Sequence, residues 1–405
     1  MRLVRIFLAA LSLSFHLVVH AREWESHLTF IEPDSATGTS RAVITDNLSL
    51  VHTSQILPFD APGQIIARDT RLQATRILTV LSGILTHWNS GYTAITKLNI
   101  YIRHTNDIPL VQQALASTFR GTNKPAASFV ITALPHPDAL VAMDAVAVPR
   151  LHLNEPRAWK TNMPPGPPFD REIHPASGLT SGPLVYVSGM ADTNNLPEAT
   201  RVTLSKLMTT IGHLGLTAAD VVQLKAFFQP MSNAEVVRKV IVDFFQSNAP
   251  PTVFVEWISP APNPPIEIEL IAVGKPDSTN ANESVTFLTP PGTTSTKVFS
   301  RVAKVNGGKL IFVSGLYGMN AHDGEGEVRE IFQSLRTILT TTGSDFEHLV
   351  KATYYVSDDL AGNKLNDIRP EFFNPLRPPA ASKAKVRGVG VAGKTVTLDM
   401  IAVTK

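Results

Sequence analysis

The feature that most constrains this chain is a pattern of elements that occurs three times. A short apolar strand ends in Val-Ser-Gly at residues 187–189 and again at residues 313–315, and a degenerate copy, His-Thr-Ser, ends a similar strand at residues 52–54. Each copy precedes a helix-like segment, a strand, a second helix that ends in Phe, a turn that contains Pro and two further strands. This period is much longer than that of solenoid repeats, so it predicts three whole domains in tandem that pack against one another.

The N-terminus has the pattern of an export signal. Arg2 and Arg5 precede an apolar run at residues 6–19, and Val-His-Ala at residues 19–21 is similar to a small-residue cleavage site. The run is short for a membrane span, although an uncleaved anchor is the alternative. We therefore expect a signal peptide at residues 1–21 and a periplasmic or secreted protein that has no membrane attachment after signal cleavage.

Two segments with biased composition separate the repeats. Pro is dense at residues 149–168, which is typical of a stiff, extended connector. Polar residues dominate the second segment, which begins at Lys275. The expected organisation is domain 1 at residues 22–150, a Pro-rich linker at 151–171, domain 2 at 172–274, a second linker at 275–296 and domain 3 at 297–405.

The composition argues against several classes of function. The chain has no Cys, which excludes disulfides, thiolate catalysis and Cys-ligated zinc. Its formal net charge is only +2, and Lys and Arg are spread along the chain, so no basic footprint for nucleic acid is present. The 12 His residues lack metal-ligand spacing, and neither a phosphate-binding Gly loop nor a nucleophile elbow occurs. We expect no metal, no cofactor and no nucleic-acid partner.

Apolar residues at helical spacing predict two amphipathic helices in each repeat. The strands around these helices give the order strand, helix, strand, helix, strands, which is typical of an α+β domain with both helices on one face of a mixed sheet. The other face is bare and apolar, and burying it is worth about 25 cal/mol per Å². We therefore expect three sheets turned inward and helices outside. In repeat three the first helix is predicted from Val328, Ile331, Phe332, Leu335, Ile338 and Leu339.

Four motifs of repeat two lie in the same order as those of a known family. They are Val-Ser-Gly at residues 187–189, Phe-Phe at 244–245, Pro-Pro at 250–251 and Glu-Ile-Glu-Leu-Ile-Ala at 267–272. With these motifs the chain resembles the RidA (YjgF, endoribonuclease L-PSP-like) family over nearly its whole mature length. Repeat three carries counterparts at residues 313–315, 372–373, 379–382 and 398–402, and repeat one keeps those at 125–128 and 143–147.

The resemblance implies both a fold and an assembly. The family domain is a small α+β unit similar to chorismate mutase, and it normally forms a homotrimer with ligand clefts between subunits. Three tandem copies therefore imply an intramolecular pseudo-trimer that is a monomer in solution and binds a small-molecule metabolite.

The resemblance also implies a chemistry for which this chain lacks one residue. The family hydrolyses reactive enamines or imines to 2-keto acids, and the Arg of a Pro-[Ala/Ser]-Arg-Ser motif holds the substrate carboxylate, as a planar guanidinium can. The matching residues here are Ala127, Thr252 and, after a shift of one residue, Ala381. Loss of this arginine would remove binding energy and orientation.

One carboxylate of the family site is kept in a single repeat. Glu267 matches the residue that positions water, which makes it the candidate catalytic residue, although an exposed strand carboxylate is an equally good interpretation. The other repeats have Ala142 and Thr397 at this position.

Further candidates for ligand binding follow from the same resemblance. Asn366 matches an Asn that faces the cleft from the second helix, although it could simply be solvated. Arg41 and Arg301 each follow a Ser before the first strong strand of a repeat, where either could supply a new partner for a carboxylate or lie on the surface. The candidate ligand-binding residues are Ser188, Gly189, Thr252, Ser314, Gly315, Asn366 and Arg301.

Three functions remain open from the sequence. The first is an exported RidA-like protein that binds small carboxylate or imine-type metabolites in inter-domain clefts. The second is an active enamine/imine deaminase of the 2-iminobutanoate/2-iminopropanoate type with a rearranged carboxylate partner. The third is a non-catalytic scaffold with vestigial clefts.

Overall fold

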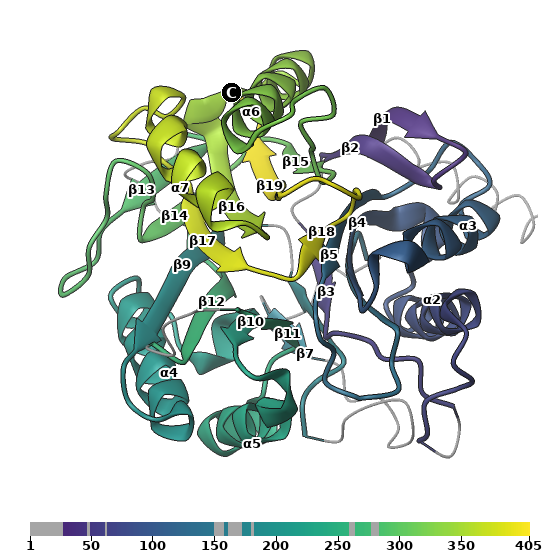
Figure 1. Cartoon of the computed structure of the whole chain (residues 1–405). Helices are drawn as coiled ribbons and strands as arrows, with labels where there is room; N and C mark the ends of the chain where they lie inside the picture. The colour runs from purple at the N-terminus through teal and green to yellow at the C-terminus, as the bar shows by residue number, and fades with distance from the viewer. Residues whose placement is uncertain are drawn as a thin grey trace, which may run out of the picture.

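The computed structural model describes residues 27–46, 49–60, 63–149, 158–160, 172–179, 182–258, 264–276 and 283–405. The expected signal peptide at residues 1–21 and most of the expected Pro-rich linker lie outside these ranges. Within them, no helix has the length and apolar character needed to cross a membrane. Three groups of helices and strands surround a common centre in Figure 1.

Each domain is a four-stranded mixed sheet with two helices on one face. In domain 3 the strand order is β15-β19-β16-β17, in which only the β16–β17 pair is parallel. The apolar residues predicted to face the sheet from the first helix are all buried, which confirms that prediction. The elements are β15 (Leu310–Val313), α6 (Gly324–Thr341), β16 (Leu349–Val356), α7 (Asp359–Ile368), β17 (Ala380–Lys385) and β19 (Val396–Val403).

Domains 1 and 2 repeat this topology, with orders β3-β6-β4-β5 and β9-β12-β10-β11. The prediction of tandem α+β domains is therefore confirmed. Domain 1 contains β3 (Leu50–Thr53), α2 (Thr70–His87), β4 (Ile95–Ile102), α3 (Ile108–Thr118), β5 (Ala126–Ile131) and β6 (Val141–Ala147). Domain 2 contains β9 (Leu184–Asp192), α4 (Leu196–Gly212), β10 (Val221–Phe228), α5 (Ala234–Phe245), β11 (Thr252–Glu256) and β12 (Ile266–Val273).

Strand pairs join each domain to the next. β3 pairs with β8 of domain 2, β9 pairs with β14 of domain 3, and β15 pairs with β2 of domain 1, all antiparallel. The expected linkers also contain short strands, because β7 pairs with β8 and β13 pairs with β14. The remaining strands are β1 (Leu28–Asp34), β2 (Thr39–Thr45), β7 (Ala158–Lys160), β8 (Ala176–Leu179), β13 (Val285–Leu288), β14 (Val302–Val305) and β18 (Gly388–Val389).

The register of β3 corrects the match made from the sequence. His52 pairs with Val146 in β6, just as Phe312 pairs with Ile401 in the equivalent strand β19. His52 is therefore the counterpart of Phe312, which precedes Val-Ser-Gly, and the predicted match is one residue too early. The counterpart of Val-Ser-Gly in domain 1 is Thr-Ser-Gln at residues 53–55.

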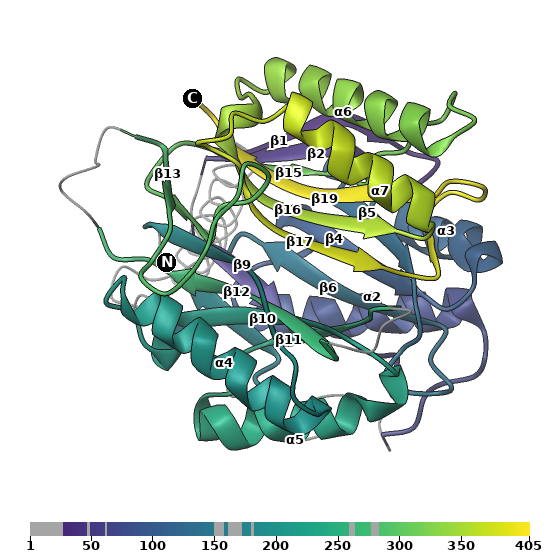
Figure 2. The same ribbon diagram turned by 60° about the vertical axis from the view of Figure 1, so that its left-hand side comes forward.

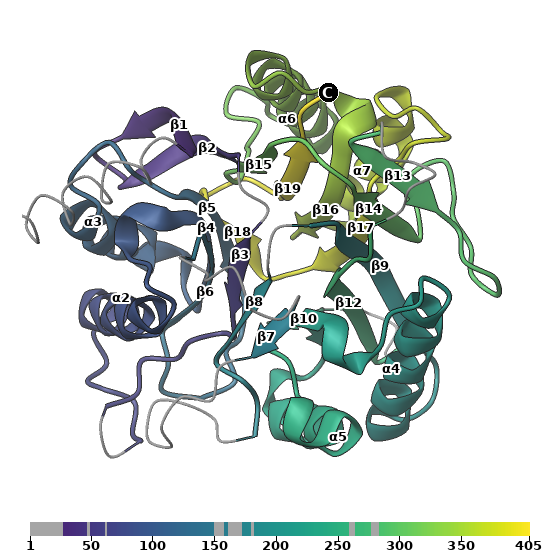
Figure 3. The same ribbon diagram turned by 180° about the vertical axis from the view of Figure 1, so that it is seen from behind.

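The sheets face the centre of the molecule and the helices lie on its rim. Figures 2 and 3 show α2 to α7 around the outside, with the strands between them. Two apolar clusters fill the centre with residues from all three domains. One includes Val146, Ile271 and Ile401, and the other includes Tyr101, Phe227 and Tyr355.

A buried polar layer, which the sequence did not predict, lies along the same strands. Its acidic members occupy equivalent positions: Asp144 lies opposite Asn99, Glu269 opposite Lys225 and Asp399 opposite Thr353. Because Asp399 of domain 3 pairs with lysines of domains 1 and 2, the layer links the three sheets.

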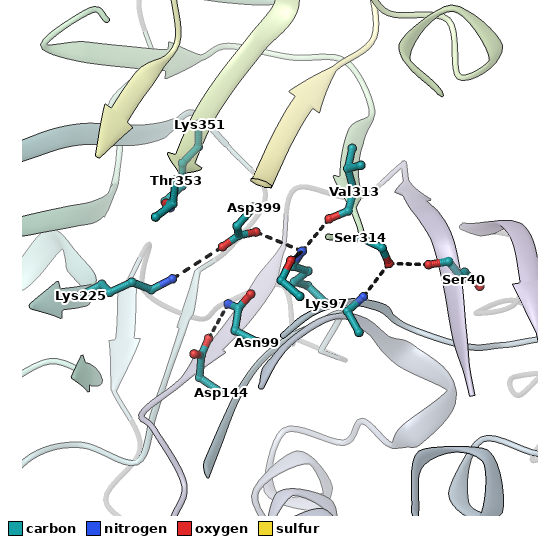
Figure 4. Close-up of polar contacts among 12 residues, drawn as sticks. Ser40, Lys97, Asn99, Asp144, Lys225, Val313, Ser314, Lys351, Thr353 and Asp399 are labelled. Carbon is teal, nitrogen blue, oxygen red and sulfur yellow. Dashed lines mark hydrogen bonds and ion pairs between the residues drawn. The ribbon is translucent and has the colours of Figure 1, made fainter. Parts of the chain in front are cut away.

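Asp399 is the most heavily paired member of this layer. Its carboxylate lies 3.0 Å from Lys97 Nζ and 3.6 Å from Lys225 Nζ, which approach it from domains 1 and 2 (Figure 4). Burial alone would raise the pKa of Asp399, but these ammonium groups and that of Lys351 hold the pKa well below its usual range. Glu269 Oε1 forms an ion pair with Lys351 Nζ at 2.8 Å.

Asp144 is held differently. Asn99 Nδ2 and the Tyr101 hydroxyl donate hydrogen bonds to its two carboxylate oxygens at 2.9 and 2.7 Å. Burial raises the pKa of Asp144, although these donors and Lys225 act in the opposite direction.

Candidate functional site

Three equivalent junctions between domains are each built around one serine. In every junction the serine hydroxyl donates to a backbone carbonyl of the next domain and accepts a backbone N–H from that domain's edge strand. We name them junction 1–2, junction 2–3 and junction 3–1 after the domains that they join. The serines are Ser54, with His174 O at 2.8 Å and Thr252 N at 3.1 Å; Ser188, with Ser300 O at 2.6 Å and Ala381 N at 2.7 Å; and Ser314, with Ser40 O at 2.5 Å and Ala127 N at 2.7 Å.

These bonds place the three residues that were matched to the family arginine at equivalent points. Ala127, Thr252 and Ala381 each donate the N–H that reaches the serine of the preceding domain. Thr252 therefore belongs to junction 1–2, whereas Glu267 belongs to junction 2–3. Thr252 and Glu267 lie in the same domain but at different junctions.

In junction 2–3 the carboxylate of Glu267 lies on the backbone of Gly189. A Cβ atom at Gly189 would be 2.0 Å from Glu267 Oε1, so only glycine leaves room for the carboxylate. The Gly189 N–H donates to Ser382 Oγ of domain 3 at 3.2 Å. Strand β9 of domain 2 and strand β17 of domain 3 thus enclose the carboxylate between them.

The electrostatic surroundings keep Glu267 near its titration point at neutral pH. Burial raises the pKa of Glu267 to about 7; Glu269 adds to this effect, while Ser382, Arg301 and Lys383 oppose it. A carboxyl group with such a pKa can both donate and accept a proton near pH 7, which is the property required of a general acid–base group.

Arg301 lies against the same glycine. Its Nη1 donates to Gly189 O at 2.8 Å, and its guanidinium lies 5.3 Å from the centre of the Phe299 ring. Only 8% of its surface is exposed. Burial lowers the pKa of Arg301, and the carboxylate of Glu267 opposes this. Arg41, which has the same place in the sequence of domain 1, instead pairs with Glu32 at 3.0 Å on the surface.

Asn366 reaches junction 2–3 through its neighbours. It lies on α7, and its Oδ1 accepts hydrogen bonds from Lys383 Nζ at 3.1 Å and from Arg369 Nη2 at 3.2 Å. Lys383 follows Ser382 directly in β17 and interacts electrostatically with Glu267. The structure thus associates Ser188, Gly189, Glu267, Arg301 and Asn366 with one junction.

In junction 1–2 a glutamine takes the place of the glycine. Gln55 Nε2 donates to Phe254 O at 3.1 Å, and Gln55 Oε1 accepts from Phe254 N at 3.4 Å. The Thr252 hydroxyl donates to Pro250 O at 2.9 Å within its own domain. The side chain of Gln55 therefore bonds to β11, the edge strand of domain 2. In junction 2–3 the equivalent residue is Gly189, which has no side chain.

In junction 3–1 a tyrosine occupies the corresponding space. The Tyr317 hydroxyl would lie 3.0 Å from a Cβ at Gly315 and 2.3 Å from a Cβ at Gly390, so the phenol passes between two glycines. Thr397 stands where Glu267 stands in domain 2, and its Oγ1 would lie 3.0 Å from the same Cβ at Gly315. The candidates Ser314 and Gly315 thus belong to a junction that has neither Glu267 nor its buried arginine.

Other candidate sites are weaker. Among the described residues, no group of three or more His, Asp or Glu side chains could hold a metal ion. A surface hollow of about 520 Å³ is lined by Arg377, Lys405 and Gly308. Its two cations already pair with Glu283 and Asp345, at 3.5 and 2.9 Å, which is typical of a solvated surface.

Sequence reasoning missed the residues that distinguish the junctions. Gln55 was assigned no role because the first repeat was matched one position too early. Nothing in the sequence pattern distinguishes Tyr317 from other residues that follow a strand. The resemblance points to the missing arginine and assigns no role to Lys383 or Arg369. A signal was available for Lys383, since it lies only two residues after Ala381.

Comparison with known proteins supports the family that these features indicate. The sequence model of the family described as Endoribonuclease L-PSP matches residues 30–149, 174–274 and 293–404. A RutC family protein of Aquifex aeolicus is 30% identical over 122 residues, which are 28% of this chain and 95% of the relative. The 3-aminoacrylate deaminase RutC of Acinetobacter baylyi is 29% identical over 100 residues, which are 24% of this chain and 79% of the relative.

Solved structures match a single domain as well. The Rid-family protein YyfA of Yersinia pestis, whose function is described as unknown, is 25% identical, covers 30% of this chain and 98% of its own, and gives a TM-score of 0.24. Because the three matches of the sequence model together span most of the residues, the chain belongs to the Endoribonuclease L-PSP (RidA) family and carries the family domain three times in tandem.

Proposed function

We propose that this chain is an exported, single-chain pseudo-trimer that binds a small carboxylate or imine-type metabolite at junction 2–3. The observation that carries the proposal is the placement of the Glu267 carboxylate on Gly189, beside Ser382 of the neighbouring domain. A partly buried carboxyl group at an interface, close to a buried arginine, favours a binding or catalytic role over a purely structural one.

Two observations support the pseudo-trimer. The cyclic order of strand pairs, from domain 1 to 2, 2 to 3 and 3 back to 1, gives each domain the same two neighbours. The buried layer around Asp399 also needs lysines from the other two domains, since an unpaired buried charge is costly. Light scattering on the mature protein should therefore give the mass of one chain.

The geometry also suggests how a ligand would be held. Glu267 lies on Gly189 and can donate a proton to a carbonyl oxygen or an imine nitrogen of the ligand, or accept one from water, near neutral pH. Arg301 holds the Gly189 carbonyl and so fixes the backbone against which the ligand would lie.

A second candidate is imine deamination at the same junction. It is favoured by the pKa of Glu267 near 7 and by the similarity to the RutC relative, which is named a 3-aminoacrylate deaminase. In this reaction water adds across the C=N bond of an iminium, the C–N bond of the tetrahedral adduct breaks, and the adduct hydroxyl gives up its proton, which leaves a 2-oxo acid and ammonium. Glu267 would accept the proton of the attacking water and return it to the leaving nitrogen.

The test compares two glycines that occupy equivalent positions. Gly189→Ala places a methyl group into the Glu267 carboxylate, whereas Gly315→Ala meets only Thr397 and Tyr317 in junction 3–1. Calorimetric titration with 2-oxobutanoate should show binding to the wild type and to Gly315→Ala, and binding at least about tenfold weaker to Gly189→Ala. Equal affinities of the two variants would contradict the assignment to junction 2–3.

A kinetic assay separates binding from catalysis. With 2-iminopropanoate generated in situ, pyruvate release faster than in buffer would support deamination, and Glu267→Gln should remove the excess rate. Release at the buffer rate from a protein that still binds 2-oxobutanoate would leave metabolite binding as the function. A protein that shows neither property would fit the third possibility, a scaffold.

A further inference from the structure

Two cations share one neutral oxygen beside junction 2–3. Lys383 Nζ and Arg369 Nη2 both donate to Asn366 Oδ1, at 3.1 and 3.2 Å. Two positive charges that converge on an amide oxygen repel each other, and an amide dipole compensates them only in part. The arrangement gains stability when an anion lies between them.

Neither cation has a carboxylate partner among the described residues, although their neighbours do. Lys385, two positions along the same strand, pairs with Asp359 at 2.6 Å, and Lys364, on the same helix as Asn366, pairs with Glu325 at 2.9 Å. On the same strand and the same helix, acidic partners are thus present for Lys385 and Lys364, while Lys383 and Arg369 meet at an amide oxygen.

Arg369 also carries a buried N–H group that is not used. Its Nε is inaccessible to solvent and has no acceptor among the residues that the structure describes. Its guanidinium lies 5.2 Å from the centre of the Tyr354 ring, which fixes the plane of the group. This N–H is therefore an uncompensated polar group beside the two cations.

The pair lies next to the proposed ligand site. Lys383 follows Ser382, whose hydroxyl accepts the Gly189 N–H, and it is half-buried in β17. Burial lowers the pKa of Lys383, Arg369 lowers it further, and the carboxylates of Glu267 and Asp359 act against both. An anion at this point would relieve both the desolvation and the mutual repulsion.

We propose that Lys383 and Arg369 form an anion subsite that binds the carboxylate of the ligand at junction 2–3. This inference rests on the proposed function of the junction and names the class of ligand: a 2-oxo or 2-imino carboxylate whose charged end lies on the two cations and whose second carbon points to Glu267. The pair would then take the role that the resemblance assigns to an arginine, which is absent at Ala381. A guanidinium fork and an ammonium together can satisfy both oxygens of a carboxylate.

Inorganic sulfate tests the subsite without any assumption about the rest of the ligand. The melting temperature is measured against sulfate concentration at constant ionic strength, which is maintained with chloride, and converted to an apparent affinity. The variants are Lys383→Gln and Arg369→Gln, and the matched control is Lys385→Gln on the same face of β17. We expect the wild type and the control to bind sulfate alike, and each of the two variants to bind it at least about tenfold more weakly. A wild type without a saturable response, or a Lys383→Gln variant that behaves like the control, would overturn the subsite.

The second arm uses 2-oxobutanoate and its uncharged amide. The wild type should prefer the acid to 2-oxobutanamide by at least about tenfold, and Lys383→Gln should lose this preference while its affinity for the amide is unchanged. If the wild type binds the acid and Lys383→Gln binds it equally well, the inference fails and the proposed function survives. If sulfate binding depends on Lys383 but no 2-oxo acid binds, the anion subsite stands and the proposed ligand class fails.

Discussion

Junction 2–3 and junction 3–1 have the same backbone frame and differ in the side chains that occupy it. Ser188 and Ser314 make the same pair of hydrogen bonds across the domain boundary, and a glycine follows each of them. Glu267 lies on the glycine of one junction, while Tyr317 fills the other. The comparison shows that one backbone frame can hold a carboxylate beside its glycine in one copy and a phenol in another without a change of fold.

The arginines show the same divergence. Arg301 turns inward to the Gly189 carbonyl, whereas Arg41 turns outward to Glu32. Each arginine follows a serine whose backbone carbonyl accepts a hydrogen bond from the junction serine of the preceding domain. Their sequence positions are equivalent, so the difference arises from their surroundings. Arg301 lies near the Phe299 ring and the Glu267 carboxylate. Arg41 lies near the exposed carboxylate of Glu32.

The largest effect is expected in the polar layer beneath the junctions, where the copies also differ. Asp399→Asn removes the charge that Lys97 and Lys225 share and should lower the free energy of unfolding by about 3–5 kcal/mol. Asp144→Asn is the matched control, because neutral donors hold Asp144, and its cost should be about 1–2 kcal/mol. Urea unfolding followed by circular dichroism measures both, and equal losses would show that the lysines do not depend on Asp399.

Removing the side chain that fills junction 3–1 should have the next largest effect. Tyr317→Ala leaves a void between Gly315 and Gly390 and should cost about 2–3 kcal/mol, less than for a fully buried aromatic residue because Tyr317 is partly exposed. The affinity for 2-oxobutanoate should not change, since the ligand is expected at another junction. A change in that affinity would mean that the two junctions are coupled or that the site is misplaced.

The two arginines allow a sharper version of the comparison. Arg301→Ala removes a hydrogen bond to Gly189 O and a packed, buried guanidinium, so it should cost about 1–2 kcal/mol and weaken binding of 2-oxobutanoate. Arg41→Ala breaks only a surface ion pair and should change stability by less than about 0.5 kcal/mol. Unfolding curves and titration of both variants measure the contrast, and unchanged binding in Arg301→Ala would exclude the arginine from the site.

The last expected effect is a pH dependence that arises from one carboxyl group. Because the pKa of Glu267 is raised to about 7 in the folded protein, the folded state binds the proton more tightly than the unfolded chain. Its contribution to stability is therefore highest below pH 4.5 and decreases as the pH rises to 7. Relative to Glu267→Gln, the wild type should lose about 1–2 kcal/mol between pH 5 and pH 8, a value reduced because the side chain is partly exposed. Parallel curves for the two proteins would show that the pKa of Glu267 is not raised.

The sequence predicted what depends on local periodicity. The buried face of α6, with Val328, Ile331 and Leu335, followed from residues three and four apart, and the order of strands and helices followed from the repeats. Family motifs then indicated Glu267 and Gly189, which the structure brings together.

The sequence could not predict contacts between residues that only the assembled domains bring together. Lys97 and Asp399 lie in the first and third domains, and no local pattern relates them. The one-residue error at His52 has a local cause, since the register of a short strand shows only in its pairing with β6. That error concealed the role of Gln55, because the residue then fell outside the matched motif.

The number of ligands bound per chain tests the central claim that only one of the three equivalent junctions keeps a site. Calorimetric titration of the monomeric protein with 2-oxobutanoate should give one site per chain, and Gly189→Ala should abolish that site while Gly315→Ala leaves it in place. A stoichiometry of three, or a site that survives Gly189→Ala and is lost in Gly315→Ala, would contradict the account.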